Sequence, residues 1–319
     1  MATAGDLLGR LAGDLHHELG PNLLSVAVHG SWVAGDFVEG RSGLGVLVVL
    51  AHDPDRTVLG RVALVHQRLV RDYPQWADHI EVDYVSPAAV ADALEGRRDH
   101  SMLRICPGEL LHIDRVSQQY MMNWRSAVEH NQVLFGQPPG DVLPWIDDHV
   151  VREAIADNLR QWPEWSLDLR GAGGEAYAVL TVCRAAVLLR SGRFISKRAA
   201  AEELAATHPQ WAELIGWARH WWYAGGLSIE PGRTDEVTAF VTAISDELAD
   251  VLHAPAGAAA EAPRPRSLAA RILAAAQRER VRPAARFAGA GQPEGSDLLV
   301  SLAARIRGRD VASGSSRSA

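Results

Sequence analysis

The chain has 319 residues, of which 47% are hydrophobic and 22% charged, a composition typical of globular proteins and a length sufficient for two domains. Its net charge of −7 is uneven, because residues 254–319 hold 11 arginines against 5 acids and residues 1–253 therefore carry −13. A body this acidic does not attract a nucleic-acid backbone but suits a cationic small molecule. We expect a small-molecule ligand and no nucleic-acid partner.

No apolar run approaches the roughly 18 residues that a membrane span needs. The first 20 residues contain acids where a signal peptide has a basic and then an apolar segment. We therefore expect a cytoplasmic protein without a membrane partner. Cys106 and Cys183 lie far apart and match no metal-ligand spacing, so reduced thiols are predicted. Nothing in the sequence predicts the oligomeric state.

The first half of the chain alternates between helical and strand patterns, in which apolar residues recur at helical spacing or in short β-type runs. These patterns predict helices over 6–19 and 57–73, and strands over 24–28, 44–50, 79–85 and within 108–116. Two strands separated by a helix imply a crossover, so we expect a small mixed sheet flanked by helices.

The remainder of the chain turns helical from Gln118 onward. Helices are predicted over 121–135, 145–161, 175–189, 196–207, 211–223 and 235–253. The run Pro138-Pro139-Gly140 marks the expected boundary. The sequence thus predicts an α+β protein, with an α/β domain over 1–138 and an α-helical bundle domain over 139–253.

The last segment, 254–319, is rich in Ala, Arg and Pro and contains two short helical patterns, at 267–272 and 301–306. We interpret it as a solvated or loosely docked tail, because its composition offers little apolar surface to bury. A lid or a partner-docking element is the alternative interpretation.

One stretch, HGSWVAGDFVEGRSGLGVLVVL at 29–50, has a strand-turn-strand pattern suited to nucleotide transfer. Gly30 would let the backbone approach a triphosphate, and Ser31 would donate hydrogen bonds to it. The second strand should then carry two aspartates, two residues apart on one face, to hold a divalent metal. Those positions are Gly43 and Gly45. The frame of such a site is present, and its metal ligands are not.

These segments together resemble the aminoglycoside adenylyltransferases that inactivate streptomycin and spectinomycin, a branch of the nucleotidyltransferase superfamily. The first half contributes the strand, the HGS turn, the second strand and HIEVDYV. The second half contributes EHNQVLFGQPP (129–139), LTVCRAAVLLRSGRFISKRAAAEEL (180–204) and residues 211–222. The resemblance implies a nucleotidyltransferase-like first domain and a helical substrate-binding second domain.

Members of that family transfer AMP from ATP to a drug hydroxyl, using two magnesium ions held by an Asp pair and a third carboxylate. The resemblance implies that Gly30 and Ser31 match the triphosphate-binding turn, Glu81 the third carboxylate and Lys197 a phosphate-binding lysine. Arg184 is expected on the same helix as Lys197, a little over three turns earlier.

The positions where the resemblance fails are as informative as those where it holds. The metal-binding aspartates align with Gly43 and Gly45, which offer no side chain. The acids that receive the cationic drug align near Arg170 and Gly174, which leaves Glu175 as one of the nearest acids. Both the metal site and the drug site are therefore expected to differ from those of the family.

Two hypotheses about function follow. In the first, the protein is repurposed: it binds a small organic molecule in the interdomain cleft, in specialised, antibiotic-type metabolism, without a cofactor and without AMP transfer. Glu81, Asp83 and His29 would then supply metal-free acid–base chemistry. In the second, it remains an adenylyltransferase that uses ATP and magnesium with rearranged metal ligands, for which Asp83 and Asp36 are candidates.

Each candidate residue also has a purely structural interpretation. Gly30-Ser31 forms a tight turn, Glu81 and Asp83 line the solvated face of an edge strand, and His29 is a satisfied structural histidine. Arg184 and Lys197 are surface charges on helices. Trp165, in a loop-like stretch with Trp162, stacks on a flat ligand in the cleft under the functional interpretation and packs in the helical core under the structural one.

Overall fold

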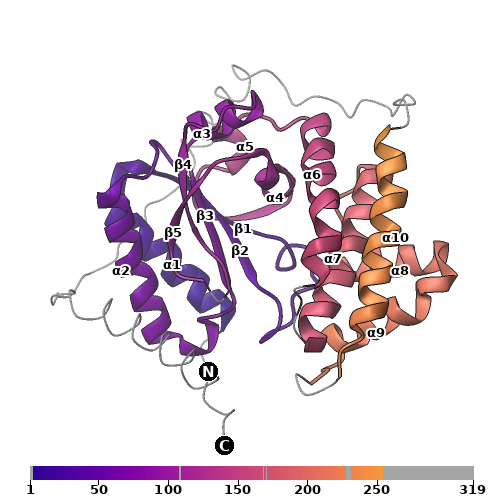
Figure 1. Ribbon diagram of the computed structural model, residues 1–319. Coiled ribbons are helices and arrows are strands. Elements are labelled where there is room, and N and C mark those ends of the chain that lie inside the picture. Colours follow the sequence, from indigo (N-terminus) through magenta and orange to yellow (C-terminus); the bar gives the residue numbers. More distant parts are fainter. Residues whose placement is uncertain (1–2, 108, 168, 170, 228–230, 254–319) are drawn as a thin grey trace, which may run out of the picture. The chain divides into compact units, whose positions relative to one another are not determined.

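Six strands form one mixed sheet within the residues that this computed structural model describes, which are 3–107, 109–167, 169, 171–227 and 231–253 (Figure 1). The strands are β1 (Leu23–His29), β2 (Leu44–Leu50), β3 (Ile80–Val85), β4 (Ser101–Ile105), β5 (His112–Arg115) and β6 (Asn131–Gly136). The helices are α1 (Ala4–Leu19), α2 (Arg56–Asp72), α3 (Pro87–Leu94), α4 (Met121–Glu129), α5 (Pro139–Val142), α6 (Asp148–Leu167), α7 (Gly171–Ser191), α8 (Lys197–Thr207), α9 (Ala212–Tyr223) and α10 (Thr234–His253). Short 3-10 helices lie at Gly20–Asn22, Pro74–Trp76, Gln118–Tyr120 and Pro209–Trp211.

The strand order is β5-β4-β3-β2-β1-β6. Strands β2 and β3 are parallel, because α2 returns the chain between them as a crossover, and the other neighbouring pairs are antiparallel. The predicted mixed sheet flanked by helices, and the α+β class, are thereby confirmed.

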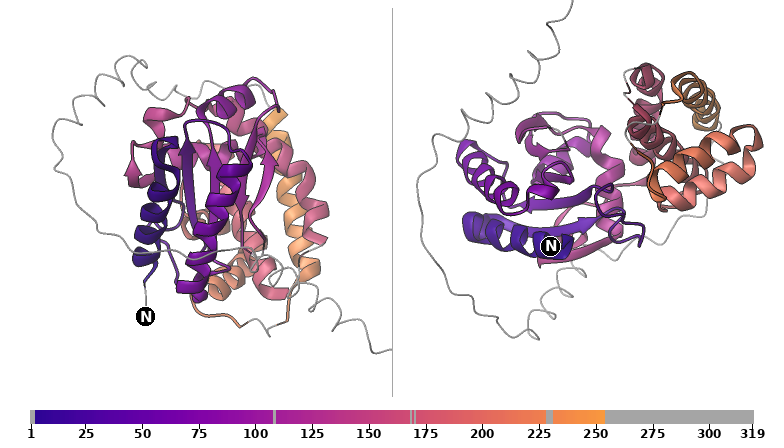
Figure 2. Two further views of the ribbon diagram at one scale, coloured as in Figure 1. Left: turned by 90° about the vertical axis from the view of Figure 1, so that its left-hand side faces the viewer. Right: turned by 90° about the horizontal axis from the view of Figure 1, so that it is seen from below.

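Both faces of the sheet are buried, since successive side chains of a strand point to opposite sides. Helices α1 and α2 cover the face that carries Val46 and Val82 (Figure 2). The opposite face carries Leu47 and Val85, which pack in one apolar cluster with α3, α4 and the helices that follow. Positions 43, 45, 81 and 83 alternate onto this second face, so the candidate site lies there.

Strand β6 replaces the end of the predicted helix 121–135, and this part of the prediction was wrong. Helix α4 ends at Glu129, where the Asn131 side chain donates to the carbonyls of Ala127 and Val128. The segment that follows pairs antiparallel with β1 and satisfies the backbone groups of what would otherwise be an unpaired edge. Tertiary pairing thus overrides the local helical pattern.

The chain after Gly136 is helical, as predicted, and α7 lies at the centre of the helices. By length and composition α7 could span a membrane, with a mean hydropathy of 1.4, but 72% of this window is buried in the protein. The buried core helix of a globular protein has the same length and hydropathy as a membrane span. The division into domains at 138/139 stays a prediction, and the predicted tail 254–319 lies outside the described residues.

The stretch around Trp162 and Trp165 is helical and forms the last turns of α6, which contains Pro163. The prediction of a loop at this stretch was therefore wrong. Trp162 is buried and Trp165 packs against the same apolar cluster, so burial of two large rings holds the helix past the proline.

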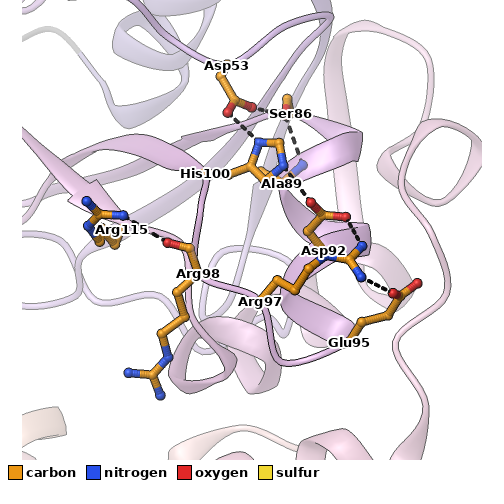
Figure 3. A network of polar contacts seen from close by, with 9 residues as sticks. All are labelled: Asp53, Ser86, Ala89, Asp92, Glu95, Arg97, Arg98, His100 and Arg115. Atoms are coloured by element: carbon orange, nitrogen blue, oxygen red, sulfur yellow. Dashed lines mark hydrogen bonds and ion pairs between the residues drawn. The ribbon is translucent and has the colours of Figure 1, made fainter.

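A polar network ties together three segments at the far end of β2 (Figure 3). Nδ1 of His100 lies 2.5 Å from Asp53 and Nε2 lies 2.8 Å from Asp92. Asp53 also accepts a hydrogen bond from Ser86, which caps α3. With carboxylates on both ring nitrogens, the charged imidazolium is favoured, so the pKa of His100 is raised, chiefly by the hydrogen bond to Asp53.

We predict that His100→Gln destabilises the protein most at low pH. A raised folded pKa means that the stabilisation is fully present below the unfolded pKa of about 6.5 and is lost as pH rises through the folded pKa. Urea denaturation at several pH values should show a difference between variant and wild type that shrinks toward pH 9. His17→Gln, at an exposed position of α1, is the control; a pH-independent difference for His100→Gln would contradict the prediction.

We also predict that Gly136→Ala destabilises the protein by about 3 kcal/mol. Gly136 has φ of 75°, and a Cβ there would lie 2.1 Å from the carbonyl oxygen of Leu24. Gly9→Ala, in the middle of α1 with open space around it, should instead stabilise by about 0.5–1 kcal/mol. Chemical denaturation measures the free energy of unfolding of both variants. Similar changes for the two would contradict the close approach of β6 to β1 at Gly136.

Candidate functional site

Three neighbouring strands bring His29, Gly45 and Glu81 into one row on the second face of the sheet. His29 pairs with Gly45 across β1 and β2, and Gly45 pairs with Glu81 across β2 and β3. Directly paired residues of adjacent strands point to the same face. Two of the three predicted catalytic residues, His29 and Glu81, are thus placed beside the position where a metal ligand was expected.

The imidazole of His29 fills the space next to Gly45. A Cβ built on Gly45 would lie 3.0 Å from Cε1 and 3.2 Å from Nε2 of His29, so a side chain there would require the ring to move. Gly43 is exposed, and a Cβ there would meet only the carbonyl oxygen of His79, at 3.8 Å. The two glycine positions therefore differ: one is open and the other is occupied by a neighbour.

Arg104, on β4, lies beside the two acids of β3, and its single charge offsets one of theirs. Its guanidinium donates to Glu81 at 2.8 Å and lies 3.8 Å from Oδ1 of Asp83. Asp83 is only 7% exposed, and its other oxygen accepts a hydrogen bond from the indole of Trp124 at 2.8 Å. Burial, opposed by Arg104, raises the pKa of Asp83 to about 6.

These residues do not fit the two-magnesium centre that the resemblance implies. A magnesium ion needs oxygen ligands at about 2.0–2.1 Å in octahedral geometry. Positions 43 and 45 offer no side-chain oxygen, and Glu81 accepts a hydrogen bond from Arg104. One oxygen of Asp83 accepts from Trp124, and the other is buried without a hydrogen-bond partner, 3.8 Å from Arg104. Within the described part of the chain, no three His, Cys, Asp or Glu side chains converge as a metal site.

Lys197 and Arg184 lie on different helices, α8 and α7, so the expectation of a shared helix was wrong. The chain leaves α7 at Gly192 with a positive φ, and the Ser196 side chain caps the start of α8. The charge of Arg184 bears on Lys197 and on His29, and that of Glu81 bears on Lys197.

The side chain of Lys197 stacks on aromatic rings. Its Nζ lies 3.4 Å from the centroid of the Tyr177 ring and 5.9 Å from that of Trp222. Burial and the neighbouring Arg184 lower its pKa well below the usual value, and Glu81 opposes this. Burial and Arg184 likewise lower the pKa of His29 to about 4, so this imidazole is neutral at pH 7.

The turn after β1 is fastened to the helices by Asp36 and Arg41. Asp36 is 7% exposed and accepts hydrogen bonds from Nε of Arg198 at 2.8 Å and from the hydroxyl of Tyr223 at 2.7 Å. Arg41 donates to the carbonyls of Trp221 and Gly226. Asp36, a candidate substitute metal ligand, is therefore engaged within the protein.

Gly30 has φ of 73°, a left-handed conformation that favours glycine. Beyond it, the amide of Ala34 donates to the carbonyl of Gly30, and that of Asp36 donates to the carbonyl of Ser31. The turn that carries Gly30 and Ser31 is thus internally hydrogen-bonded as well as fastened at Asp36.

Two predicted ligand-binding residues are placed elsewhere in the helical part. Glu175 is 1% exposed, and its carboxylate accepts hydrogen bonds from the amide of Arg233 and the hydroxyl of Thr234 at the start of α10. Trp165 packs in the helical core. The contacts of both residues favour the structural interpretation.

Arg104, Tyr177 and Trp222 are members of the cluster that the sequence did not single out. Arg104 lies on β4, a strand that was not predicted, and Tyr177 and Trp222 lie on helices without a distinctive pattern. The composition gave one indication of this cluster: Lys197 is the single lysine of the chain, beside 31 arginines.

Comparison with known proteins supports the resemblance. Residues 141–247 match the family model of the aminoglycoside adenylyltransferase C-terminal domain. The structure of spectinomycin adenyltransferase AAD(9) from Enterococcus faecialis, determined with ATP and spectinomycin, matches with a TM-score of 0.64 and 18% identity, over 77% of this chain and 100% of that chain. No curated protein sequence matches the chain. The predicted likeness to the aminoglycoside adenylyltransferases is confirmed, and so is the nucleotidyltransferase-like fold.

We predict that the two glycines respond differently to aspartate. Gly43→Asp should change stability by less than about 0.5 kcal/mol, because the position is open. Gly45→Asp should destabilise by about 1–3 kcal/mol, because the new side chain displaces the His29 ring and faces Glu81. Denaturant titration measures both, and His29→Ala in the Gly45→Asp background should recover part of the loss. Equal costs at the two positions would show that His29 does not fill this space.

Proposed function

We propose that this protein binds a small organic anion at Arg184 and Lys197 and that it has lost metal-dependent AMP transfer. The observation that carries the proposal is the occupation of the metal position by the protein itself, through the His29 ring beside Gly45 and the Arg104 guanidinium on Glu81. Nucleotidyl transfer relies on metal ions to neutralise the triphosphate and to orient the reacting oxygens.

The charges of the cluster favour an anion over a cationic drug. Within the described part of the chain, neither Arg184 nor Lys197 has a carboxylate oxygen within 4.0 Å. The acids nearby are engaged: Glu81 by Arg104, and Asp36 by Arg198. Arg184, whose charge is permanent, attracts carboxylate or phosphate groups and repels an ammonium group, and Lys197 adds hydrogen-bond donors near it.

A hollow of about 470 Å³ lies where the end of α4 meets the segment between α7 and α8. It is lined by Glu129, His130 and 192–195. Its lining residues are close in the chain to residues of the cluster: Asn131, which pairs with His29, follows His130, and Lys197 follows residue 195 by two positions. The partly buried side chains at 194 and 195 supply its apolar surface.

The setting of this function is proposed from the relatives. The matching structure is that of an enzyme of spectinomycin modification, and we place this protein in specialised, antibiotic-type metabolism in the cytoplasm. Metal-free acid–base chemistry would fall to Glu81 and His29, because Asp83 is buried away from solvent.

The proposal is tested by binding and transfer measurements on the full chain. We expect no AMP transfer from Mg·ATP to spectinomycin or streptomycin. In EDTA, pyrophosphate should bind, and Arg184→Met should weaken its binding by about ten- to hundredfold, the value of a charge-assisted hydrogen bond.

Arg160→Met is the matched control for this measurement, because Arg160 is an exposed arginine of α6 with its side chain 70% accessible, and its loss should leave binding unchanged. AMP transfer by the wild type would establish the alternative, an adenylyltransferase with rearranged metal ligands. Equal effects of the two Arg→Met variants would refute the anion site.

A further inference from the structure

Three consecutive aromatic residues at the end of α9, 221–223, each lie against a basic side chain. Measured from Cζ of arginine or Nζ of lysine to the ring centroid, the pairs are Arg41 over Trp221 at 4.7 Å, Lys197 over Trp222 at 5.9 Å and Arg198 over Tyr223 at 4.0 Å. The face of an aromatic ring carries partial negative charge and attracts cations. This aromatic run is therefore a row of cation contacts that α9 makes with α8 and with the turn after β1.

Lys197 differs from the two arginines in what else its cationic group contacts. Arg41 also donates to two backbone carbonyls, and Arg198 donates to a carboxylate of the turn. No carboxylate among the described residues lies within 4.0 Å of the Lys197 amine. Its Nζ instead lies 3.4 Å from the centroid of the Tyr177 ring, and the centroids of Tyr177 and Trp222 are 5.8 Å apart. Two neighbouring rings, from α7 and α9, thus take the place of an acid.

An aromatic partner affects the site differently from a carboxylate. A carboxylate cancels the charge of an ammonium group, whereas a ring attracts the ammonium without carrying a net charge. This attraction requires the charged form of the amine. The two rings therefore oppose burial and the Arg184 charge, which lower the pKa of the amine, as Glu81 also does. The result is an ammonium group that is held in place and keeps its charge.

The place of Lys197 in α8 also indicates a role beyond stability. It is the first residue of the helix, directly after the Ser196 cap. A cation adds to the positive end of the helix macrodipole and is unfavourable there, whereas an anion is favoured. The first turn of α8 contains no acidic residue. Positive charge is thus concentrated at this end of the helix, which suits an anionic ligand.

We propose that Tyr177 and Trp222 are positioning residues that hold the Lys197 ammonium as a donor to the bound anion. This inference rests on the proposed anion site. Tyr177 has the closer contact, and 42% of it is exposed, so its ring contributes less to the apolar core than a buried ring does. Trp222 has the more distant contact, at 5.9 Å, and lies beside the Tyr177 ring.

The first test observes the position of the amine directly by NMR on the full chain. Lys197 is the single lysine, so protein grown on lysine labelled with carbon-13 at Cε gives a signal from this residue alone. We expect its Hε protons to resonate upfield of their position in the urea-unfolded protein, because of the ring current of Tyr177. Tyr177→Leu should lose most of this shift, and Tyr177→Phe, which keeps a ring, should retain it. Tyr73→Leu, at the end of α2, is the matched control and should leave the signal unchanged.

The second test measures pyrophosphate binding in EDTA by the same variants, after circular dichroism has shown that each is folded. Tyr177→Leu should weaken binding about three- to tenfold and Trp222→Leu less, whereas Tyr177→Phe should stay within about twofold of wild type. Lys197→Met, which removes the amine, should weaken binding about tenfold or more.

The two measurements separate this inference from the site on which it rests. An unchanged Lys197 signal in Tyr177→Leu would overturn the positioning role, whatever that variant does to binding. A changed signal with wild-type affinity would also overturn it, if Lys197→Met weakens binding. Wild-type affinity in Lys197→Met would instead refute the anion site at Lys197, and the positioning role with it, while the NMR signal would still show whether the rings hold the amine.

Discussion

The arrangement of the whole site depends on one buried carboxylate, Asp36. It lies in the turn after β1 and is held by Arg198 of α8 and Tyr223 of α9. Arg198 is the neighbour of Lys197, so this contact holds the start of α8 close to the turn that follows the strand carrying His29. Burial of the Asp36 carboxylate has a desolvation penalty that its hydrogen bonds offset in part, while the Arg198 side chain stays 46% exposed. In return, these contacts hold Asp36 next to Arg198 and Tyr223, which are more than 160 positions away in the chain.

Arg104 supplies a permanent positive charge beside the two acids of β3. A metal ion arrives and leaves with the nucleotide, and its charge is present only when it is bound. A guanidinium between Glu81 and Asp83 is permanent, because arginine does not deprotonate in proteins. The positive charge of Arg104 is therefore part of the folded protein and does not depend on a bound ion.

Most of the elements were predictable, and the contacts of the site were not. Helix α1 and strands β1 to β3 have strong periodic patterns, and the glycines at 43 and 45 could be aligned by their distance from the HGS turn. Strand β6 escaped prediction because its partner is more than a hundred residues away, and pairing overrides local pattern. Glu175 could not be assigned from sequence, since nothing local shows that its carboxylate holds the start of α10.

The fastening of the turn by Asp36 and Arg41 has a consequence for the thermodynamics of ligand binding. A free loop must lose backbone entropy when it closes on a ligand, at about 1–2 kcal/mol per residue fixed. Here that entropy has already been lost on folding, because side chains of the loop are bonded to α8, α9 and the carbonyl of Gly226. Under the proposed function, a ligand that contacts Gly30 and Ser31 would meet a surface that is already ordered, which lowers the entropic cost of its binding.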